Sequence, residues 1–376
     1  MNDVQLAYNA FGQLTSDYQE HGGAVNLSTT PEVAYGYADG SANTIRPTTM
    51  TYPNGRVLTF DYGASQADAA SRVNALIDND GITQLAAYSY LGTGAFVIAN
   101  SPQPNVQYTL IGTAGGNDPV TGDIYRGLDL FGRIKDSYWY NTGTATDADR
   151  IQYGYDRAGN RTYRQNTVAE SLTAEFDELY QYDGIQRLKD MQRGTLNSTQ
   201  TGLTSESFAQ CWGLDATGNW QGFQEDDTGA GIWSLVQSRA ANTVNEITRV
   251  TNSTGPAWAQ PAYDKNGNMT TVPQPANPGS AYTATYDAWN RLVKLVDAPT
   301  GDTVQVNQYD GRKYRTVRET YTSGTLSEAR HYYYSHRWQS LEERLGASPD
   351  TAAAERQFVW GERYIDNLVI RDFNGA

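Results

Sequence analysis

Polar and apolar residues alternate along most of this chain, in short segments separated by turns. In residues 291–296 (RLVKLV) and 313–321 (KYRTVRETY), for example, polar side chains are interleaved with apolar or aromatic ones. Successive side chains of a β-strand point to opposite faces, so this alternation predicts strands with one packed and one solvated side. Helical spacing is confined to residues 65–76 and 351–356, where we expect short helices. The chain is therefore predicted to be all-β.

A five-residue motif, Asp-x-x-Gly followed by Asn or Arg, recurs between the alternating segments. Asp can accept hydrogen bonds from backbone N–H groups further along the turn, and Gly three residues later adopts the positive φ that closes a hairpin with a bulge. Gln186 and Asn290 replace this Gly in two copies. We expect a shortened turn after Asp310 and a degenerate copy near Asn242. The predicted turn residues are Asp129, Gly132, Asp156, Gly159, Asp183, Asp215, Gly218, Asp264, Gly267, Asp287, Asn290 and Asp310.

Tyrosines recur at a spacing of two just before many of these turns. Residues i and i+2 of a strand share one face, so the pairs predict an aromatic ladder on one side of each hairpin. The predicted ladder residues are Tyr153, Tyr155, Tyr180, Tyr182, Tyr286 and Tyr309. A single hairpin is marginal in water, so we expect tandem hairpins to pair into a long coiled antiparallel sheet. The repeats are degenerate in residues 1–119 and regular in residues 120–376, and the two parts are expected to be continuous.

Two copies of the motif carry a wider resemblance. Residues 155–161 (YDRAGNR) and 286–292 (YDAWNRL) resemble the YD repeat of the Rhs proteins, and the closing segment 358–366 (FVWGERYID) adds to the resemblance to that family. Relatives in that family include bacterial wall-associated proteins, the C component of insecticidal toxin complexes, and teneurins. The resemblance is close over residues 120–376 and looser over residues 1–119. It implies a strip of β-hairpins that winds in a spiral, as part of a shell whose hollow interior holds a polypeptide.

The sequence departs from that family at both ends. After Asp372 there is no further YD unit and no Rhs-associated core, the part that plugs the shell, carries an aspartyl self-cleavage site in some members and precedes a toxin. Met1 lies inside a repeat, without an export signal or plug before it. The resemblance therefore implies neither shell closure nor self-cleavage nor toxin activity, and a fragment is as consistent with the sequence as a whole protein. Secretion or a cell-surface location is implied if the chain is part of a full-length Rhs protein.

Charge and composition exclude several partners. The chain has 42 acidic and 28 basic residues, and its net charge of −14 argues against nucleic acid or an anionic membrane surface as the main partner. Apolar residues make up only 39%, whereas 27 Tyr, 9 Phe and 8 Trp are present, so aromatic side chains must build much of the core. The apolar run 95–99 is too short for a transmembrane segment, and residues 1–20 do not resemble a signal peptide.

Residues able to carry chemistry are few and scattered. We expect His331 and His336 at the solvent edge of a strand, on opposite faces, and Cys211 as an inert thiol that has no cysteine partner in the chain. The carboxylate runs 225–227 and 342–343 are expected to be solvated. We therefore predict no catalytic residue, no cofactor and no metal.

Three functions remain open on this sequence. The leading hypothesis is a non-enzymatic structural segment of a shell that encloses or scaffolds a polypeptide, with cargo or the missing parts of a larger shell as its partner. The alternative is a cell-surface carbohydrate- or protein-binding module that binds glycans through exposed aromatics such as Trp220 or Trp258. A polysaccharide hydrolase would need a carboxylate such as Glu225 or Asp226 to act on the substrate.

Overall fold

The structure is a computed structural model that describes residues 2–38, 45–64, 66–92, 95–111, 126–347 and 352–373. The regular structure of these residues is nearly all antiparallel β-strand, in sheets of 18 and 10 strands, with two helices of four and five residues. The chain divides into two compact units: Met1–Gln107, Tyr286–Val296 and Asp302–Ala376 form unit 1, and Tyr108–Thr285 and Asp297–Gly301 form unit 2. The all-β prediction of tandem paired hairpins is confirmed.

Unit 1 contains two runs of strands in which each strand pairs antiparallel with the next one along the chain. The first run is β1 (Val4–Tyr8), β2 (Leu14–Gln19), β3 (Glu32–Tyr37), β4 (Pro47–Thr51), β5 (Val57–Asp61), β6 (Ala75–Ile77), β7 (Gln84–Leu91) and β8 (Ala95–Ser101), with helix α1 (Gln66–Ala69) between β5 and β6. The second run is β22 (Leu292–Asp297), β23 (Thr303–Tyr309), β24 (Arg315–Thr322), β25 (Thr325–Tyr334), β26 (Ser340–Leu345), β27 (Ala354–Trp360) and β28 (Leu368–Phe373).

In unit 2 consecutive strands also pair, with one break after Thr254, where the chain leaves the 18-stranded sheet and enters the 10-stranded one. Strand β9 (Val106–Thr109) crosses the boundary between the residue ranges of the two units. The strands of unit 2 are β10 (Asp136–Asn141), β11 (Thr146–Tyr155), β12 (Arg161–Asn166), β13 (Asp177–Tyr182), β14 (Leu188–Leu196), β15 (Leu203–Leu214), β16 (Trp220–Asp226), β17 (Leu235–Ala241), β18 (Ile247–Thr254), β19 (Ala262–Tyr263), β20 (Met269–Pro273) and β21 (Ala281–Tyr286), with helix α2 (Thr167–Ser171) after β12.

A β-bulge stands directly before each of several motif turns. The register shifts between Gly154 and Tyr155, between Gln181 and Tyr182, and between Gln308 and Tyr309. A bulge next to a tight turn lets the loop close while the flanking strands keep their twist. The bulge therefore interrupts the regular alternation of side chains just before the tyrosine that precedes the turn.

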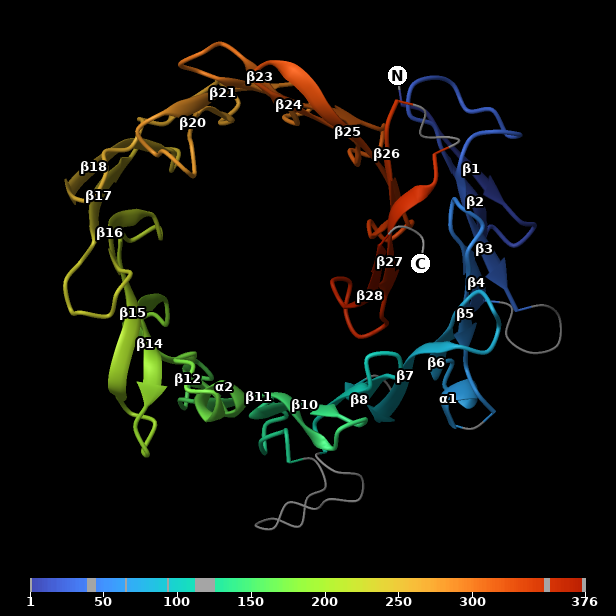
Figure 1. The fold of residues 1–376 in the computed structure, drawn as a ribbon, viewed down its shortest axis with the longest axis horizontal. Helices are drawn as coiled ribbons and strands as arrows, with labels where there is room; N and C mark the ends of the chain where they lie inside the picture. The colour runs from blue at the N-terminus through green and yellow to red at the C-terminus, as the bar shows by residue number, and fades with distance from the viewer. Residues whose placement is uncertain are drawn as a thin grey trace. The chain divides into compact units, whose positions relative to one another are not determined.

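The main hydrophobic cluster lies in unit 1, where the two runs of strands face each other (Figure 1). Its fully buried members include Tyr52 and Leu58 from the first run and Leu341 and Val359 from the second. Strands β25–β28 are drawn beside β1–β5 in Figure 1, and the Tyr52 hydroxyl donates a hydrogen bond to the Phe358 carbonyl at 2.8 Å. This unit is therefore a two-layered packing of hairpin strips.

Both helix predictions need correction. Within the predicted helix 65–76, the described residues 66–76 contain the short α1 and then enter strand β6. In the predicted helix 351–356, the described residues 352–356 run into strand β27, because Ala354 and Gln357 are buried where β27 pairs with β26. The predicted boundary between residues 119 and 120 lies outside the described residues.

Candidate functional site

The turn motif folds into a loop that satisfies its own polar groups. At the first copy, the Asp129 amide donates to the Arg133 carbonyl at 2.9 Å, and the Gly132 amide donates back to the Asp129 carbonyl at 3.0 Å. Asp129 Oδ1 also accepts from the amides of Phe131 and Arg133, both at 2.9 Å. The same two backbone bonds close the turns that begin at Asp156, Asp183, Asp215, Asp264, Asp287 and Asp310.

The fourth residue of the turn has a positive φ, and its value depends on the copy. It is 93° at Gly159 and Gly218 and 83° at Gly267, but 68° at Gln186 and 61° at Asn290. The left-handed region near 57° admits residues with a side chain at moderate cost, whereas values near 90° favour Gly strongly. Gln186 and Asn290 thus occupy turns whose φ lies close to the left-handed region that a residue with a side chain can adopt.

The expected shortening of the turn after Asp310 is wrong. Asp310 Oδ1 accepts from the Tyr314 amide at 2.9 Å, and the Asp310 amide donates to the Tyr314 carbonyl at 3.0 Å, as in the full-length turns. Lys313 occupies the fourth position with a φ of 74°. The misleading signal was Gly311, which lies at the second position of a turn of ordinary length.

A tyrosine directly before a turn ties that hairpin to the preceding one. The Tyr155 hydroxyl donates to the Ile134 carbonyl at 2.6 Å, and the Tyr309 hydroxyl donates to the Leu292 carbonyl at 2.8 Å. Each acceptor lies five residues after the first residue of the preceding turn. Equivalent bonds come from Tyr37, Tyr182 and Tyr334. The predicted ladder residues Tyr153, Tyr155, Tyr180, Tyr182, Tyr286 and Tyr309 are all half-buried.

Arginine at the fifth turn position adds a second tie. Arg291 pairs with Asp287 of its own turn at 2.6 Å, and its Nη1 donates to the carbonyl of Asp310, in the next turn, at 2.8 Å. Its guanidinium also lies 4.8 Å from the ring centre of Tyr309, a favourable cation–π contact. Arg187 likewise donates to the carbonyl of the next turn, at Asp215, at 2.6 Å. The Tyr-Asp pair is thus the place where one hairpin receives the arginine of another.

Asparagine at the fifth position closes the turn on itself. Asn219 Nδ2 donates to Asp215 Oδ2 at 2.9 Å, and this bond is the main reason that the pKa of Asp215 falls to about 2. The pKa of Asp156 is lowered in the same way by the side chain of Asn160. These turn carboxylates therefore stay ionised at neutral pH and serve as acceptors.

The two layers of unit 1 are joined by polar contacts that the sequence did not reveal. The side-chain amide of Gln19 accepts from the Tyr334 amide at 3.0 Å and donates to the Tyr334 carbonyl at 2.8 Å, like one rung of a β-ladder. The buried carboxylate of Asp17 pairs with Arg312 at 2.6 Å. Burial raises the pKa of Asp17, and Arg312 opposes this shift.

Arg56 joins the layers in a further place. It forms a two-pronged pair with Asp78, with nitrogen–oxygen distances of 2.7 and 2.8 Å, and a third bond to Asp372 of β28 at 2.5 Å. The fork geometry of a guanidinium suits this arrangement, whereas a lysine could not make all three bonds.

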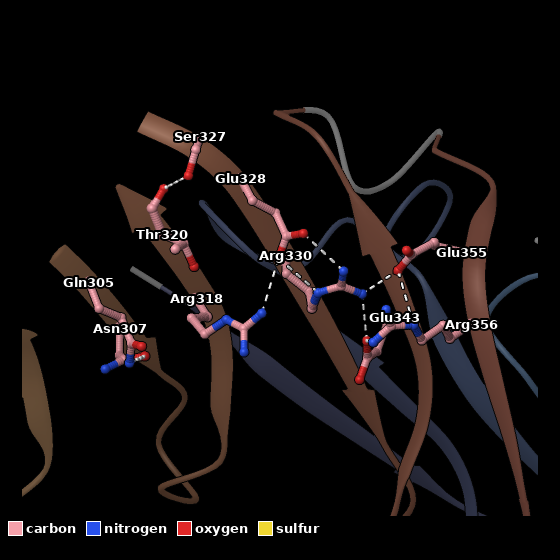
Figure 2. A network of polar contacts seen from close by, with 10 residues as sticks. All are labelled: Gln305, Asn307, Arg318, Thr320, Ser327, Glu328, Arg330, Glu343, Glu355 and Arg356. Atoms are coloured by element: carbon pink, nitrogen blue, oxygen red, sulfur yellow. Dashed lines mark hydrogen bonds and ion pairs between the residues drawn. The ribbon is translucent and has the colours of Figure 1, made fainter. Parts of the chain in front are cut away.

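A row of charged side chains crosses β24 to β27 (Figure 2). Arg330 is only 4% exposed and bonds Glu328 at 3.0 Å, Glu343 at 2.6 Å and also Glu355. Burial acts to lower the pKa of Arg330, but the three carboxylates outweigh it and raise the pKa. Arg356 lies 3.4 Å from Glu343 and Arg318 lies 3.0 Å from Glu328, so charges alternate in sign across the strands. This face is polar yet internally neutralised.

Several groups expected at the surface are buried. Asp226 is 1% exposed, and its carboxylate accepts from the amides of Thr228, Gly229, Gly231 and Ile232. These bonds lower its pKa to about 2 and make it the organiser of a loop. Glu342, Glu343 and His331 are also buried, because two layers of strands cover positions that an isolated sheet would expose.

The remaining candidates give no chemical centre. Cys211 is half-buried, and burial together with Asp190 raises the pKa of its thiol to about 11. Among the described residues, no group of three or more His, Cys, Asp or Glu side chains is placed to hold a metal ion. None of the described helices is long and apolar enough to cross a membrane. Trp220 is 39% exposed, but Phe223 stacks on it and Arg239 lies 4.9 Å from its ring centre.

The arrangement is that of a β-hairpin strip found in toxin-complex structures. The crystal structure of TcdB2–TccC3–Cdc42 matches with a TM-score of 0.56 and 11% identity, over 98% of this chain and 20% of that chain. TcdB2–TccC3 without its hypervariable C-terminal region gives 0.46 at 12% identity, over 98% and 20%. The Tc holotoxin pore of Photorhabdus luminescens gives 0.40 at 12% identity, over 99% and 20%. This chain thus spans about a fifth of the length of the chains it matches. No family model and no curated protein matches it.

Proposed function

We propose that this chain is a segment of an Rhs-type shell of YD-repeat hairpins, and that it encloses or scaffolds a polypeptide without catalysing a reaction. The observation that carries the proposal is the tie between consecutive hairpins, in which a Tyr hydroxyl and an Arg guanidinium reach from one turn to the next, as at Arg291, Tyr309 and Asp310. Hydrogen bonds between consecutive hairpins can hold a long strip of strands together without a globular core. Such a strip can form the wall of a shell.

The fold and the electrostatics support the same proposal. The likeness to TcdB2–TccC3–Cdc42 extends over 98% of this chain. The charged side chains around Arg330 are largely buried and pair with one another, so they stabilise the paired strands of the segment itself. The carboxylate of Asp226 is engaged by the amides of a loop. The raised pKa of the Cys211 thiol keeps it protonated, which disfavours its use as a nucleophile.

Protease protection tests this function directly. The protein is purified from its source cells without denaturant and treated with trypsin, and the surviving peptides are identified by mass spectrometry. We expect a polypeptide outside residues 1–376 to survive, and to be digested faster when Gln19→Ala removes the bonds to Tyr334. Gln192→Ala, which removes a bond to Glu206 within unit 2, is the matched control. A native protein that holds and protects no polypeptide would contradict the proposal.

A further inference from the structure

Unit 1 contains a cavity of about 440 Å³ between its two layers, beside the turn that joins β25 to β26. Its size lies within the range of roughly 300–1,000 Å³ that is usual for ligand pockets. Six aromatic side chains line it, and they come from both layers: Tyr35, Phe60, Tyr62, Tyr90, Phe96 and Trp360. We call it the arginine–aromatic cavity, since Arg46, Arg72 and Arg337 complete its walls.

The charges around the cavity favour an anion. Three arginines and one carboxylate, Glu362, line it, which contrasts with the net charge of −14 of the whole chain. Arg46 is already paired with Asp68 at 2.5 Å, and Arg337 with Glu362 at 3.4 Å. Arg72 donates to the Gly92 carbonyl and lies 4.6 Å from the ring centre of Tyr90, and it pairs with no carboxylate in the described part of the chain.

The aromatic walls are fixed in place. The Tyr62 hydroxyl donates to the Pro47 carbonyl at 2.8 Å, and Trp360 Nε1 donates to the Ser340 carbonyl at 2.6 Å. Tyr90 and Phe96 lie with their ring centres 4.6 Å apart. Because the Tyr62 hydroxyl and the Trp360 ring nitrogen are already hydrogen-bonded to backbone carbonyls, these two side chains offer mainly apolar ring surface to the cavity, which suits another aromatic ring.

We propose that the arginine–aromatic cavity binds an aromatic residue of a polypeptide, with a carboxylate next to the ring paired to Arg72. The inference rests on the proposed function, because the ligand would be part of the polypeptide that the segment encloses. It specifies where that polypeptide binds. The bound ring packs against the aromatic side chains of the cavity. Its carboxylate pairs with the guanidinium of Arg72, which has no carboxylate partner in the described part of the chain.

Calorimetric titration of the full chain with two probes tests this site. The probes are N-acetyl-phenylalanine and its amide, which differ only in the carboxylate. We expect the acid to bind roughly tenfold more tightly, as one charge-assisted contact implies. Arg72→Gln should bring the acid to the affinity of the amide, and Arg72→Lys should restore part of the preference. Arg161→Gln is the matched control, since Arg161 also lies over a tyrosine ring, 4.0 Å from that of Tyr153, but outside the cavity.

The outcomes separate this inference from the proposed function. The site would be overturned if the acid and the amide bound equally well, or if neither bound. It would also be overturned if the Arg161→Gln protein lost the preference for the acid as fully as the Arg72→Gln protein. Circular dichroism checks that all variants are folded. A third probe, Gly-Gly-Phe with a free carboxylate, distinguishes the source of the ligand. Affinity at least equal to that of N-acetyl-phenylalanine supports a polypeptide, and much weaker binding means a free aromatic acid instead. Protease protection is scored independently, so either proposal can fail alone.

Discussion

Units 1 and 2 share the turn motif and the tyrosine hydroxyl bonds between hairpins, but they differ in how far their strands are covered. In unit 1, Tyr333 and Leu341 are completely buried, and the main hydrophobic cluster lies between two layers of strands. In unit 2, the predicted ladder residues Tyr155 and Tyr182 are half-buried and hold neighbouring hairpins through their hydroxyl groups. The comparison shows that the motif specifies a strip, whereas a buried core arises where a second strip covers the first.

The largest expected difference between the units concerns core packing. Leu341→Ala should lower the free energy of unfolding of unit 1 by about 3 kcal/mol, because it empties a completely buried position. Leu188→Ala, at a half-buried position of unit 2, should cost about 1 kcal/mol. Denaturant unfolding of both variants measures this difference. Equal costs would mean that the layered packing adds nothing to unit 1.

Turn geometry should matter most in copies with a large φ. Gly159→Val should destabilise unit 2 by about 2 kcal/mol, because a β-branched residue resists the φ of 93° found there. Gln186→Gly, at a φ of 68°, should change stability by less than about 1 kcal/mol. Thermal unfolding of the two variants gives the comparison. Unchanged stability of the Gly159→Val protein would contradict the turn assignment.

Acid should weaken unit 1 before unit 2, since all three histidines lie in unit 1. His21 and His331 are buried with their Nδ1 atoms 3.2 Å apart. Burial, the neighbouring His331 and Arg344 lower the pKa of His21 to about 3, and burial also lowers the pKa of His331. Each folded pKa lies below the unfolded value of about 6.5, so this stability is complete above pH 6.5 and is lost as the pH falls.

At pH 5.5 the loss from His21 should be about 1 kcal/mol relative to pH 7.5. Hydrogen exchange measured by mass spectrometry at both pH values reports on each unit separately. His21→Gln should flatten the dependence in β2 and β25, while the peptides of unit 2 serve as the internal reference. If hydrogen exchange rose equally in both units between pH 7.5 and pH 5.5, the histidine pair would not be the cause of the acid sensitivity.

The strip could be predicted from the sequence, but its covered surfaces could not. Asp at the first turn position and Tyr before it act locally, so their spacing was visible in the sequence. The burial of His331 and Glu342 depends on residues about 300 positions away, such as His21 and Asn54, which contact them across the layers. The turn from Ser335 to Gln339 was also missed, because Ser and Trp338 replace Asp and Gly while its backbone bonds are unchanged.

The smallest expected effect tests the tie between hairpins. Tyr155→Phe removes the hydroxyl that donates to the Ile134 carbonyl at 2.6 Å, and it should cost about 1 kcal/mol in the free energy of unfolding. Tyr153→Phe is the matched control, because Tyr153 is two residues away on β11, and its hydroxyl has no hydrogen-bond partner in the described part of the chain. Denaturant unfolding measures both. If the two variants lose equal stability, ring packing and not the hydroxyl holds neighbouring hairpins together, and unit 2 would differ from unit 1 only in how much aromatic surface it buries.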